Sequence, residues 1–489
     1  MKKKSLASFL MFIMVISLAL VGCSSKEKGT AEKDNSKPYE ITMAYVNFTN
    51  AEELPLVQNE INKITKKKIN ATVKLMPIGA AAWTQQSTLL LSGNEKLDLI
   101  ITSATNGYLV PAAKGQLLPL DNLLAKHGKG VLDTLPQHII EGTRVNGKIY
   151  GVPSVREFAN DQGFIMRKDI VDKYNIDLSQ IKTFEDLGNV FDIVKKNEPN
   201  LTAIVNQGSL LTTVGLINGG KFDPLGDYLG VMSYKEKKII NMFEDPDYVK
   251  GVELARKWSE AGYTLKDAAT TTDSAANIVK AGKGFGYSVN MKPGFETQET
   301  LATGMEMVAV RLTKPSTNSN VSTLINMSIA RNSENPEKAM EFINLLYTDK
   351  DIMNLLANGI EGKHYKLNSD GTIKLIKGSK YVLNQWQIGN NALTNPYEGN
   401  SPKYWDEILE FNESAVVSPA IGFQFNPDPV KTEIAASTNV INQYKAALEA
   451  GALDPDKIVP EFNKKLKDAG LDKIIAEKQK QFDEWKKKN

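Results

Sequence analysis

The sequence predicts an α/β fold built from more than one domain. Strand-like and helix-like patterns alternate through residues 40–102, and residues 97–101 (LDLII) form a continuous apolar run typical of a parallel strand buried on both faces. Such alternation favours a mostly parallel sheet with right-handed crossovers. The length of 489 residues exceeds what one hydrophobic core usually holds, so we expect two or more domains.

The first elements follow from apolar spacing. Alternating apolar residues indicate strands at 41–45 and 73–75, and apolar stripes indicate helices at 54–64 and 83–91. In an open sheet, ligands bind at the carboxyl ends of the strands. We therefore expect three segments near one edge of the sheet: 45–48, 77–83 and 103–108.

The N-terminus has the pattern of an export signal. Lysines at 2–4 precede an apolar stretch at 6–20 that is too short for a comfortable membrane span. The stretch ends in LVGC, which is similar to a bacterial lipobox, and Cys23 is the only cysteine of the chain. We interpret residues 1–22 as a lipoprotein signal peptide, Cys23 as the lipid (palmitate-type) attachment site and residues 23–38 as a flexible tether. The alternative is a chance cysteine after an ordinary signal peptide.

The composition and the absence of known motifs limit the functions that the sequence can indicate. Lys plus Arg number 59 and Asp plus Glu 57, so the net charge of +2 gives no indication of a nucleic-acid partner. The three histidines are far apart, and no GxSxG, HExxH, Walker A or dinucleotide motif occurs. Residues 368–371 (NSDG) predict a hairpin turn rather than a calcium loop. We predict no catalytic residue, no metal and no cofactor.

The stretch from Asn146 to Tyr174 links two predicted strands through a polar connection. Apolar runs at 148–152 and 163–166 flank it, and Pro153 ends the first run because proline cannot donate to a sheet ladder. The connection carries Arg156, Glu157, Asn160 and Asp161, which are unusual choices for a plain turn.

These residues resemble a known family. The motif GKIYGVP (147–153), followed by a strand and RKDIV (167–171), is similar to the first crossover of extracellular solute-binding proteins, family 1, of the carbohydrate class of ABC transporters. The segments 113–120 (AKGQLLPL) and 328–346 (SIARNSENPEKAMEFINLL) match further parts of the same pattern. The runs NPYEGNSP and SPAIGFQFNPDPVK resemble the Gram-positive lipoprotein subfamily with an extended C-terminal domain of the DUF3502 type.

The resemblance implies a two-lobed, periplasmic-binding-protein-like fold of type II, with a mostly parallel sheet flanked by helices in each lobe and a multi-crossover hinge. The expected bounds are 39–153 with 320–357 for the first lobe, 154–319 for the second lobe with its hinge near 153–163, and 358–489 for an extension that packs on the second lobe.

The same resemblance implies a lipid-anchored, monomeric receptor on the outer face of the cytoplasmic membrane of a Gram-positive bacterium. It would bind a sugar or oligosaccharide between its lobes and deliver it to the permease of an ABC importer. Two alternatives stay open: a receptor for a peptide or another small molecule, and a lipid-anchored glycoside hydrolase, because that chemistry needs only two suitably spaced carboxylates. A tethered structural or adhesion protein is less favoured, because the α/β lobes predict a cleft.

Sugar binding requires aromatic faces and planar hydrogen-bonding groups. An aromatic side chain can instead belong to the core, and Arg156 with Glu157 can instead form an ion pair between lobes. Trp405, Phe423 and Phe285 are further aromatic candidates. The predicted ligand-binding residues are Trp83, Ser103, Asn106, Tyr108, Arg156, Glu157, Asn160, Tyr287, Trp386 and Tyr397.

Overall fold

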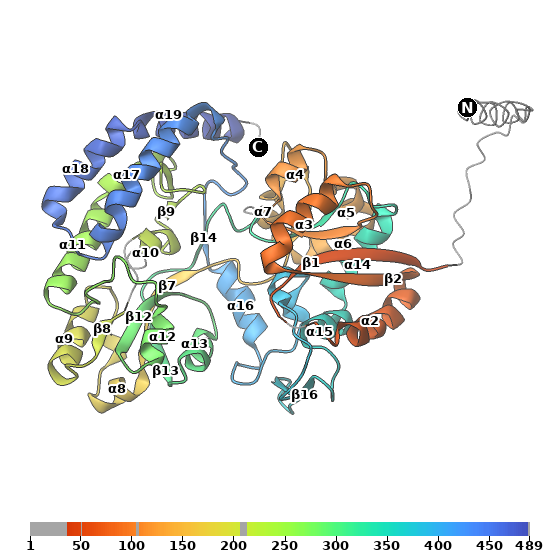
Figure 1. The fold of residues 1–489 in the computed structure, drawn as a ribbon, viewed down its shortest axis with the longest axis horizontal. Coiled ribbons are helices and arrows are strands. Elements are labelled where there is room, and N and C mark those ends of the chain that lie inside the picture. The colour runs from red at the N-terminus through yellow and green to blue at the C-terminus, as the bar shows by residue number, and fades with distance from the viewer. Residues whose placement is uncertain (1–36, 50, 104–106, 206–212, 488–489) are drawn as a thin grey trace, which may run out of the picture. The chain divides into compact units, whose positions relative to one another are not determined.

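The computed structural model describes residues 37–49, 51–103, 107–205 and 213–487 (Figure 1). The predicted signal peptide at 1–22 and Cys23 lie outside the described residues. Within these described ranges, no helix is both long and apolar enough to cross a membrane.

The first sheet combines segments from distant parts of the chain. β1 pairs in parallel with β2 and β3, whereas β15 runs antiparallel to both of its neighbours, β3 and β6. The expected strands near 41–45, 73–75 and 97–101 are confirmed. In spatial order the strands are β2 (Ala71–Gly79), β1 (Tyr39–Asn47), β3 (Leu99–Thr102), β15 (Asn326–Ile329) and β6 (Gly151–Pro153).

Helix α2 (Leu54–Ile69) shows how the sequence sets the bounds of an element. Pro55 is tolerated in the first turn because the N–H that proline lacks would have no partner within the helix there. The helix ends at Asn70, whose φ of 47° is in the left-handed region that asparagine adopts more readily than most residues. Three lysines in the last turn complement the helix dipole. The other helices of this lobe are α3 (Ala80–Ser92), α4 (Leu109–Ala113), α5 (Asp121–His127), α6 (Lys129–Thr134), α7 (Gln137–Glu141), α14 (Pro336–Thr348) and α15 (Lys350–Asn358).

The second sheet has the order β13 (Met307–Arg311), β7 (Asp161–Arg167), β12 (Gly284–Met291) and β8 (Thr202–Ile204). β7 is antiparallel to β13 and β12, and β12 is parallel to β8. In each of these two sheets a single described strand therefore opposes the rest, β15 in the first and β7 here. Each of these two strands is the first to join its sheet after the chain has crossed from the other lobe. The α/β fold with mostly co-directional strands is confirmed, with this one reversal per sheet.

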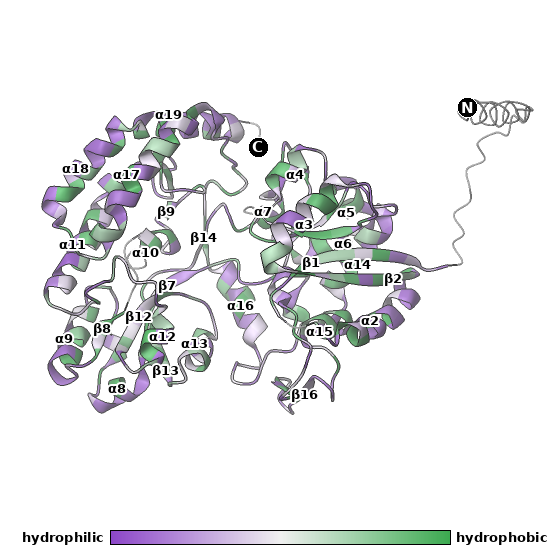
Figure 2. Cartoon of the chain, viewed as in Figure 1, coloured by the Kyte–Doolittle hydropathy of each residue, from purple (hydrophilic) through white to green (hydrophobic). Residues whose placement is uncertain are grey.

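The C-terminal region divides its contacts between two cores. Tyr381, Leu383 and Ile388 belong to the core of the first sheet. The helices α17 (Lys431–Glu449), α18 (Pro455–Asp468) and α19 (Leu471–Lys486) share a core with α11 (Pro246–Glu260), where the rings of Phe243 and Phe462 lie 4.9 Å apart. Figure 2 shows mixed polar and apolar colouring along α18 and α19, as expected for helices with one buried face. The sequence predicts that the extension at 358–489 packs on the second lobe, but in the structure it packs on both lobes, because Tyr381, Leu383 and Ile388 join the core of the first sheet.

The crossing segments are hydrogen-bonded to one another. Asn160 and Ser316 exchange backbone hydrogen bonds of 3.0 and 2.9 Å, and β14 (Ser316–Thr317) pairs in parallel with β18 (Val416–Val417). Asp223, which is fully buried on β9 (Phe222–Asp223), then anchors them. Its carboxylate accepts from the Ser319 amide at 2.6 Å, from the Ser319 hydroxyl at 2.9 Å and from the Ser418 hydroxyl at 2.6 Å. One carboxylate thus fixes two of the crossing segments to the second lobe.

Replacing Asp223 should destabilise the protein strongly. Asp223→Ala leaves four buried donors without their acceptor, namely the three of Ser319 and Ser418 and the Leu225 amide, so we expect the free energy of unfolding to fall by about 3 kcal/mol or more. Urea unfolding measures this loss. Glu60→Ala, which removes an exposed ion pair with Lys63, serves as the control and should change stability by less than about 0.5 kcal/mol. Equal effects of the two substitutions would show that the carboxylate does not hold the hinge.

Candidate binding cavity

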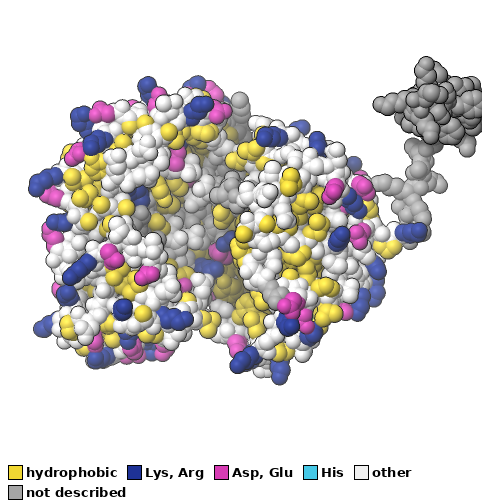
Figure 3. All heavy atoms as spheres, viewed as in Figure 1, with side chains coloured by type: hydrophobic (Ala, Val, Ile, Leu, Met, Phe, Trp, Pro, Cys, Tyr) yellow, Lys and Arg dark blue, Asp and Glu magenta, His cyan; other side chains and the backbone are white. Residues whose placement is uncertain are grey.

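A cavity of about 810 Å³ is lined by residues of the second lobe, of the first crossing and of the C-terminal region. The second lobe contributes Lys292, which directly follows β12, and helix α13 (Phe295–Thr303). The opposite wall contains Arg156 and Glu157 of the first crossing, strand β17 (Ile373–Leu375) and the short helix η5 (Gln385–Gln387). The start of α16 (Tyr404–Glu413) also lines it. Figure 3 shows a hollow between the two halves of the molecule.

Aromatic side chains provide flat faces in this cavity. Trp386 has its ring centre 5.9 Å from that of Phe48, and the rings of Tyr404 and Trp405 lie 4.9 Å apart. The backbone around Trp386 is held to the first sheet, because the Gln387 side chain is hydrogen-bonded to the amide and carbonyl of Val46 at 3.1 and 2.9 Å. The tryptophan is therefore placed at the carboxyl end of β1, where the topology predicts a ligand.

A compact group of charges lies beside the aromatic rings. The Arg156 guanidinium is 2.5 Å from the Glu157 carboxylate, and the Lys292 ammonium is 3.3 Å from the same oxygen. Burial opposes ionisation of Glu157, but the two cations outweigh it and hold the pKa of the carboxyl below its ordinary value. Burial, followed by the charge of Glu157, raises the pKa of Tyr404 to about 12. The cavity therefore contains a carboxylate and a neutral phenol at neutral pH.

Four buried polar atoms along the wall have no hydrogen-bond partner among the described residues. Two are donors, Arg156 Nε and Trp405 Nε1, and two are acceptors, Gln385 Oε1 and Asn391 Oδ1. A buried polar group without a partner costs about 1–3 kcal/mol. The wall therefore contains both donors and acceptors, which match in kind a group that both accepts and donates hydrogen bonds, as a hydroxyl does.

The structure brings part of the predicted binding set together. Arg156, Glu157, Trp386 and Tyr397 line the cavity, and so does Trp405. The question of whether Arg156 and Glu157 pair with each other is also answered, because they form an ion pair that Lys292 joins.

The other described residues of the predicted set are not among those that line this cavity. Trp83, Tyr108 and Tyr287 are buried in the hydrophobic cores, and the hydroxyl groups of the two tyrosines are bonded to Thr143 and Glu299. Asn160 makes the backbone bonds of the hinge, and the Ser103 carbonyl accepts from the Tyr108 amide at 2.9 Å. Asn106 lies outside the described residues, and Phe285 and Phe423 are core residues.

Sequence reasoning missed several lining residues, including Lys292, Gln298, Gln385, Asn391 and Tyr404. Gln385 and Asn391 flank Trp386 in the polar run NQWQIGNN, and Tyr404 adjoins Trp405, so proximity to a predicted aromatic was a usable signal. Lys292 and Gln298 carried none, because only the fold brings the end of β12 and α13 to the first crossing.

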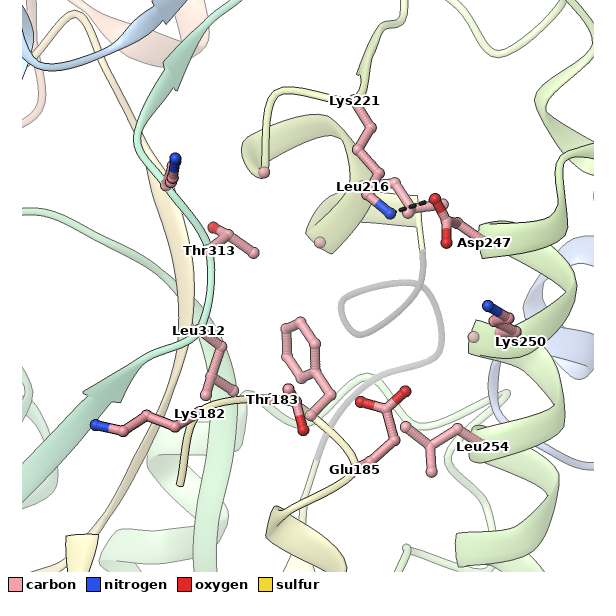
Figure 4. A pocket seen from close by; sticks show the side chains of 15 residues that line it. Lys182, Thr183, Glu185, Leu216, Lys221, Asp247, Lys250, Leu254, Leu312 and Thr313 are labelled. Carbon is pink, nitrogen blue, oxygen red and sulfur yellow. Dashed lines mark hydrogen bonds and ion pairs between the residues drawn. The ribbon is translucent and has the colours of Figure 1, made fainter. Parts of the chain in front are cut away.

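A second cavity, of about 320 Å³, lies within the second lobe (Figure 4). Leu216, Leu254 and Leu312 contribute to its wall, and Lys221 and Asp247 form an ion pair at one side. Phe184 is the only aromatic side chain among its described lining residues. It is smaller, and its described wall comes from one lobe, so it fits an oligosaccharide less well than the cavity around Trp386.

Comparison with known proteins identifies the family. The family described as "Bacterial extracellular solute-binding protein" matches residues 50–353, which is more than half of the chain. The chain belongs to the bacterial extracellular solute-binding proteins. The family described as "Domain of unknown function (DUF3502)" matches residues 419–487, which confirms the predicted type of C-terminal region.

Among relatives of this solute-binding protein, a "Carbohydrate ABC transporter substrate-binding protein" of Streptococcus pneumoniae is 29% identical over 99% of both chains. The "Polygalacturonan/rhamnogalacturonan-binding protein YtcQ" of Bacillus subtilis is 21% identical over 84% of this chain and 85% of its own. Crystal structures of the N-glycan transport solute binding protein NgtS from S. pneumoniae are 28% identical and cover 92–93% of this chain and 99% of theirs. Their TM-scores are 0.81 for a structure with no glycan named, 0.68 with Man1GlcNAc and 0.65 with Man5GlcNAc.

The lowered pKa of Glu157 predicts a specific pH dependence of stability. A carboxyl whose folded pKa lies below its unfolded value stabilises the fold fully above the unfolded pKa, and this contribution is lost as the pH falls through the folded pKa. The difference in unfolding free energy between wild type and Glu157→Gln should therefore stay constant from about pH 8 to pH 5 and shrink below about pH 4. Chemical unfolding of both proteins across this range measures it. A difference that shrinks near neutral pH would contradict the assignment.

Proposed function

We propose that this solute-binding protein is the extracellular receptor of an ABC importer and binds a sugar or oligosaccharide in the cavity around Trp386. The observation that carries the proposal is the combination of aromatic faces, amide groups and a fixed ion-pair cluster in one cavity between the second lobe and the C-terminal region. Aromatic rings pack on the C–H faces of a sugar, while amides and charged groups bind its hydroxyls. The volume of about 810 Å³ is near the upper end for ligand pockets, which favours several sugar units over one.

The relatives support this proposal. The pneumococcal relative is named for carbohydrate, and NgtS is described in complex with Man1GlcNAc and Man5GlcNAc. At the same sequence identity, the present structure resembles the NgtS structure with no glycan named more than it resembles the two complexes. We infer that the chain is described in an open form and that ligand contacts made by both lobes shift the population toward a closed one.

The location belongs to the same proposal. The signal pattern and Cys23 favour a lipid anchor on the outer face of the cytoplasmic membrane, from which the closed receptor would dock on the permease subunits as a monomer. In this proposal residues 23–38 form the tether between the lipid and the folded protein. The two lobes and the C-terminal extension have the boundaries predicted from the sequence.

The carboxylates of the cavity favour a receptor over a glycoside hydrolase. Glu157 and Glu398 are the carboxylates among its described lining residues. A glycoside hydrolase needs a carboxylic acid whose pKa is raised so that it can protonate the leaving group. The pKa of Glu157 is lowered, and Glu398 is 2.9 Å from the Lys374 ammonium. This arrangement favours a receptor over the hydrolase alternative.

A thermal-shift screen of the full chain in detergent against an oligosaccharide panel, with sugar products assayed in the same wells, tests the function. We expect one glycan class to raise the melting temperature and to be recovered intact, because a ligand that binds only the folded state stabilises it. Cleavage of the glycan would favour the hydrolase. Stabilisation by peptides alone would redirect the assignment to another solute.

Trp386 should carry much of the affinity. Trp386→Ala removes the flat face at the end of β1, so we expect the dissociation constant of the stabilising glycan to rise by about tenfold or more. Isothermal titration calorimetry measures it. Leu132→Ala, an exposed apolar residue on α6, provides the control and should leave the affinity unchanged. Unaltered affinity in Trp386→Ala would place the ligand elsewhere.

A further inference from the structure

The cations of the cavity already have an anionic partner. Arg156 and Lys292 contact the same carboxylate oxygen of Glu157, at 2.5 and 3.3 Å. Their side chains are only 22% and 24% exposed, and that of Glu157 is 16% exposed. The remaining charged residue of the described lining, Glu398, lies 2.9 Å from Lys374. Each charged side chain of the described lining is therefore paired within the protein.

A carboxylate on a ligand would meet this arrangement unfavourably. To reach Arg156 or Lys292 it would have to displace Glu157, or else lie beside it as a second negative charge. Like charges in a partly buried site repel, and a buried carboxylate that loses its cation is strongly disfavoured.

The unpartnered polar atoms of the wall include acceptors as well as donors. The orientation of Asn391 is set because its Nδ2 donates to the Val155 carbonyl at 2.9 Å, which leaves its Oδ1 as an unpartnered acceptor. Trp405 Nε1 is an unpartnered donor in the same wall. A carboxylate only accepts hydrogen bonds and cannot satisfy Asn391, whereas a sugar hydroxyl both donates and accepts.

We propose that the cavity selects uncharged oligosaccharides and that Glu157 is the residue that excludes acidic ones, by occupying Arg156 and Lys292. The proposal rests on the sugar-receptor function and adds the charge class of its cargo. Glu157 acts as a specificity-determining residue: it leaves hydrogen-bonding capacity for neutral hydroxyls and removes the free positive charge that a uronate would require.

The test compares wild type with Glu157→Gln in the full chain, using calorimetry. One ligand panel contains neutral gluco-, manno- and xylo-oligosaccharides, and the other contains oligogalacturonates and alginate oligosaccharides. Wild type should bind a neutral glycan at least about tenfold more tightly than any acidic one, with little change between about 0.05 and 0.5 M NaCl. Glu157→Gln should raise the affinity for acidic glycans by about tenfold, and salt should weaken this new binding.

Glu260→Gln is the matched control. It removes the same charge from an exposed ion pair with Arg256 on α11, so it should not create acidic-glycan binding. Acidic glycans that bind wild type as tightly as neutral ones would overturn the selectivity and leave the sugar-receptor function standing. An unchanged acidic-to-neutral ratio in Glu157→Gln would overturn the role of Glu157. Absence of binding by every glycan to both proteins would overturn the receptor function together with the inference.

Discussion

The buried carboxylate of Asp223 is the contact on which the arrangement of the two lobes depends. It binds Ser319 and Ser418 on two crossing segments, and the backbone bonds between Asn160 and Ser316 add the first crossing to the same assembly. Arg156 and Glu157 belong to that first crossing. The contacts of the hinge thus fix the position of Arg156 and Glu157 in the cavity as well as the path of the chain between the lobes.

The cavity is a place where folding leaves favourable interactions unmade. Donors and acceptors in its wall lack partners among the described residues, and Leu301 and Leu375 line it while 77% and 54% exposed. Each of these features costs free energy in the absence of a ligand. Both become favourable when a ligand supplies hydroxyls and when apolar surface is covered, so the free energy of ligand binding can favour a closed form over the open one.

Local sequence pattern was sufficient for the elements and the fold class, since α2, β1 and β3 follow directly from apolar spacing and from signals such as Asn70. It was insufficient for the site. An aromatic residue at the end of a strand or at the start of a helix looks the same whether it faces a ligand or a core. Tyr108 and Tyr287 are buried in the cores of the lobes. There the Tyr108 hydroxyl donates a hydrogen bond to the Thr143 carbonyl, and the Tyr287 hydroxyl donates one to the Glu299 carboxylate. Trp386 differs because its neighbours in the sequence are polar, and it lines the cavity.

The ion-pair cluster links specificity to lobe movement. Arg156 and Glu157 are neighbours in the sequence, so a motion of the second lobe leaves their contact intact and changes chiefly the distance from Glu157 to Lys292. Neutral hydroxyls can bind around the cluster without separating it, which allows the lobes to close with the ion pair in place. A ligand carboxylate that takes Lys292 for itself would separate the pair and oppose closure. The lowered pKa of Glu157 disfavours acid catalysis. The same carboxylate can thus discriminate between ligands in two ways, by repelling acidic ones and by allowing the lobes to close only around neutral ones.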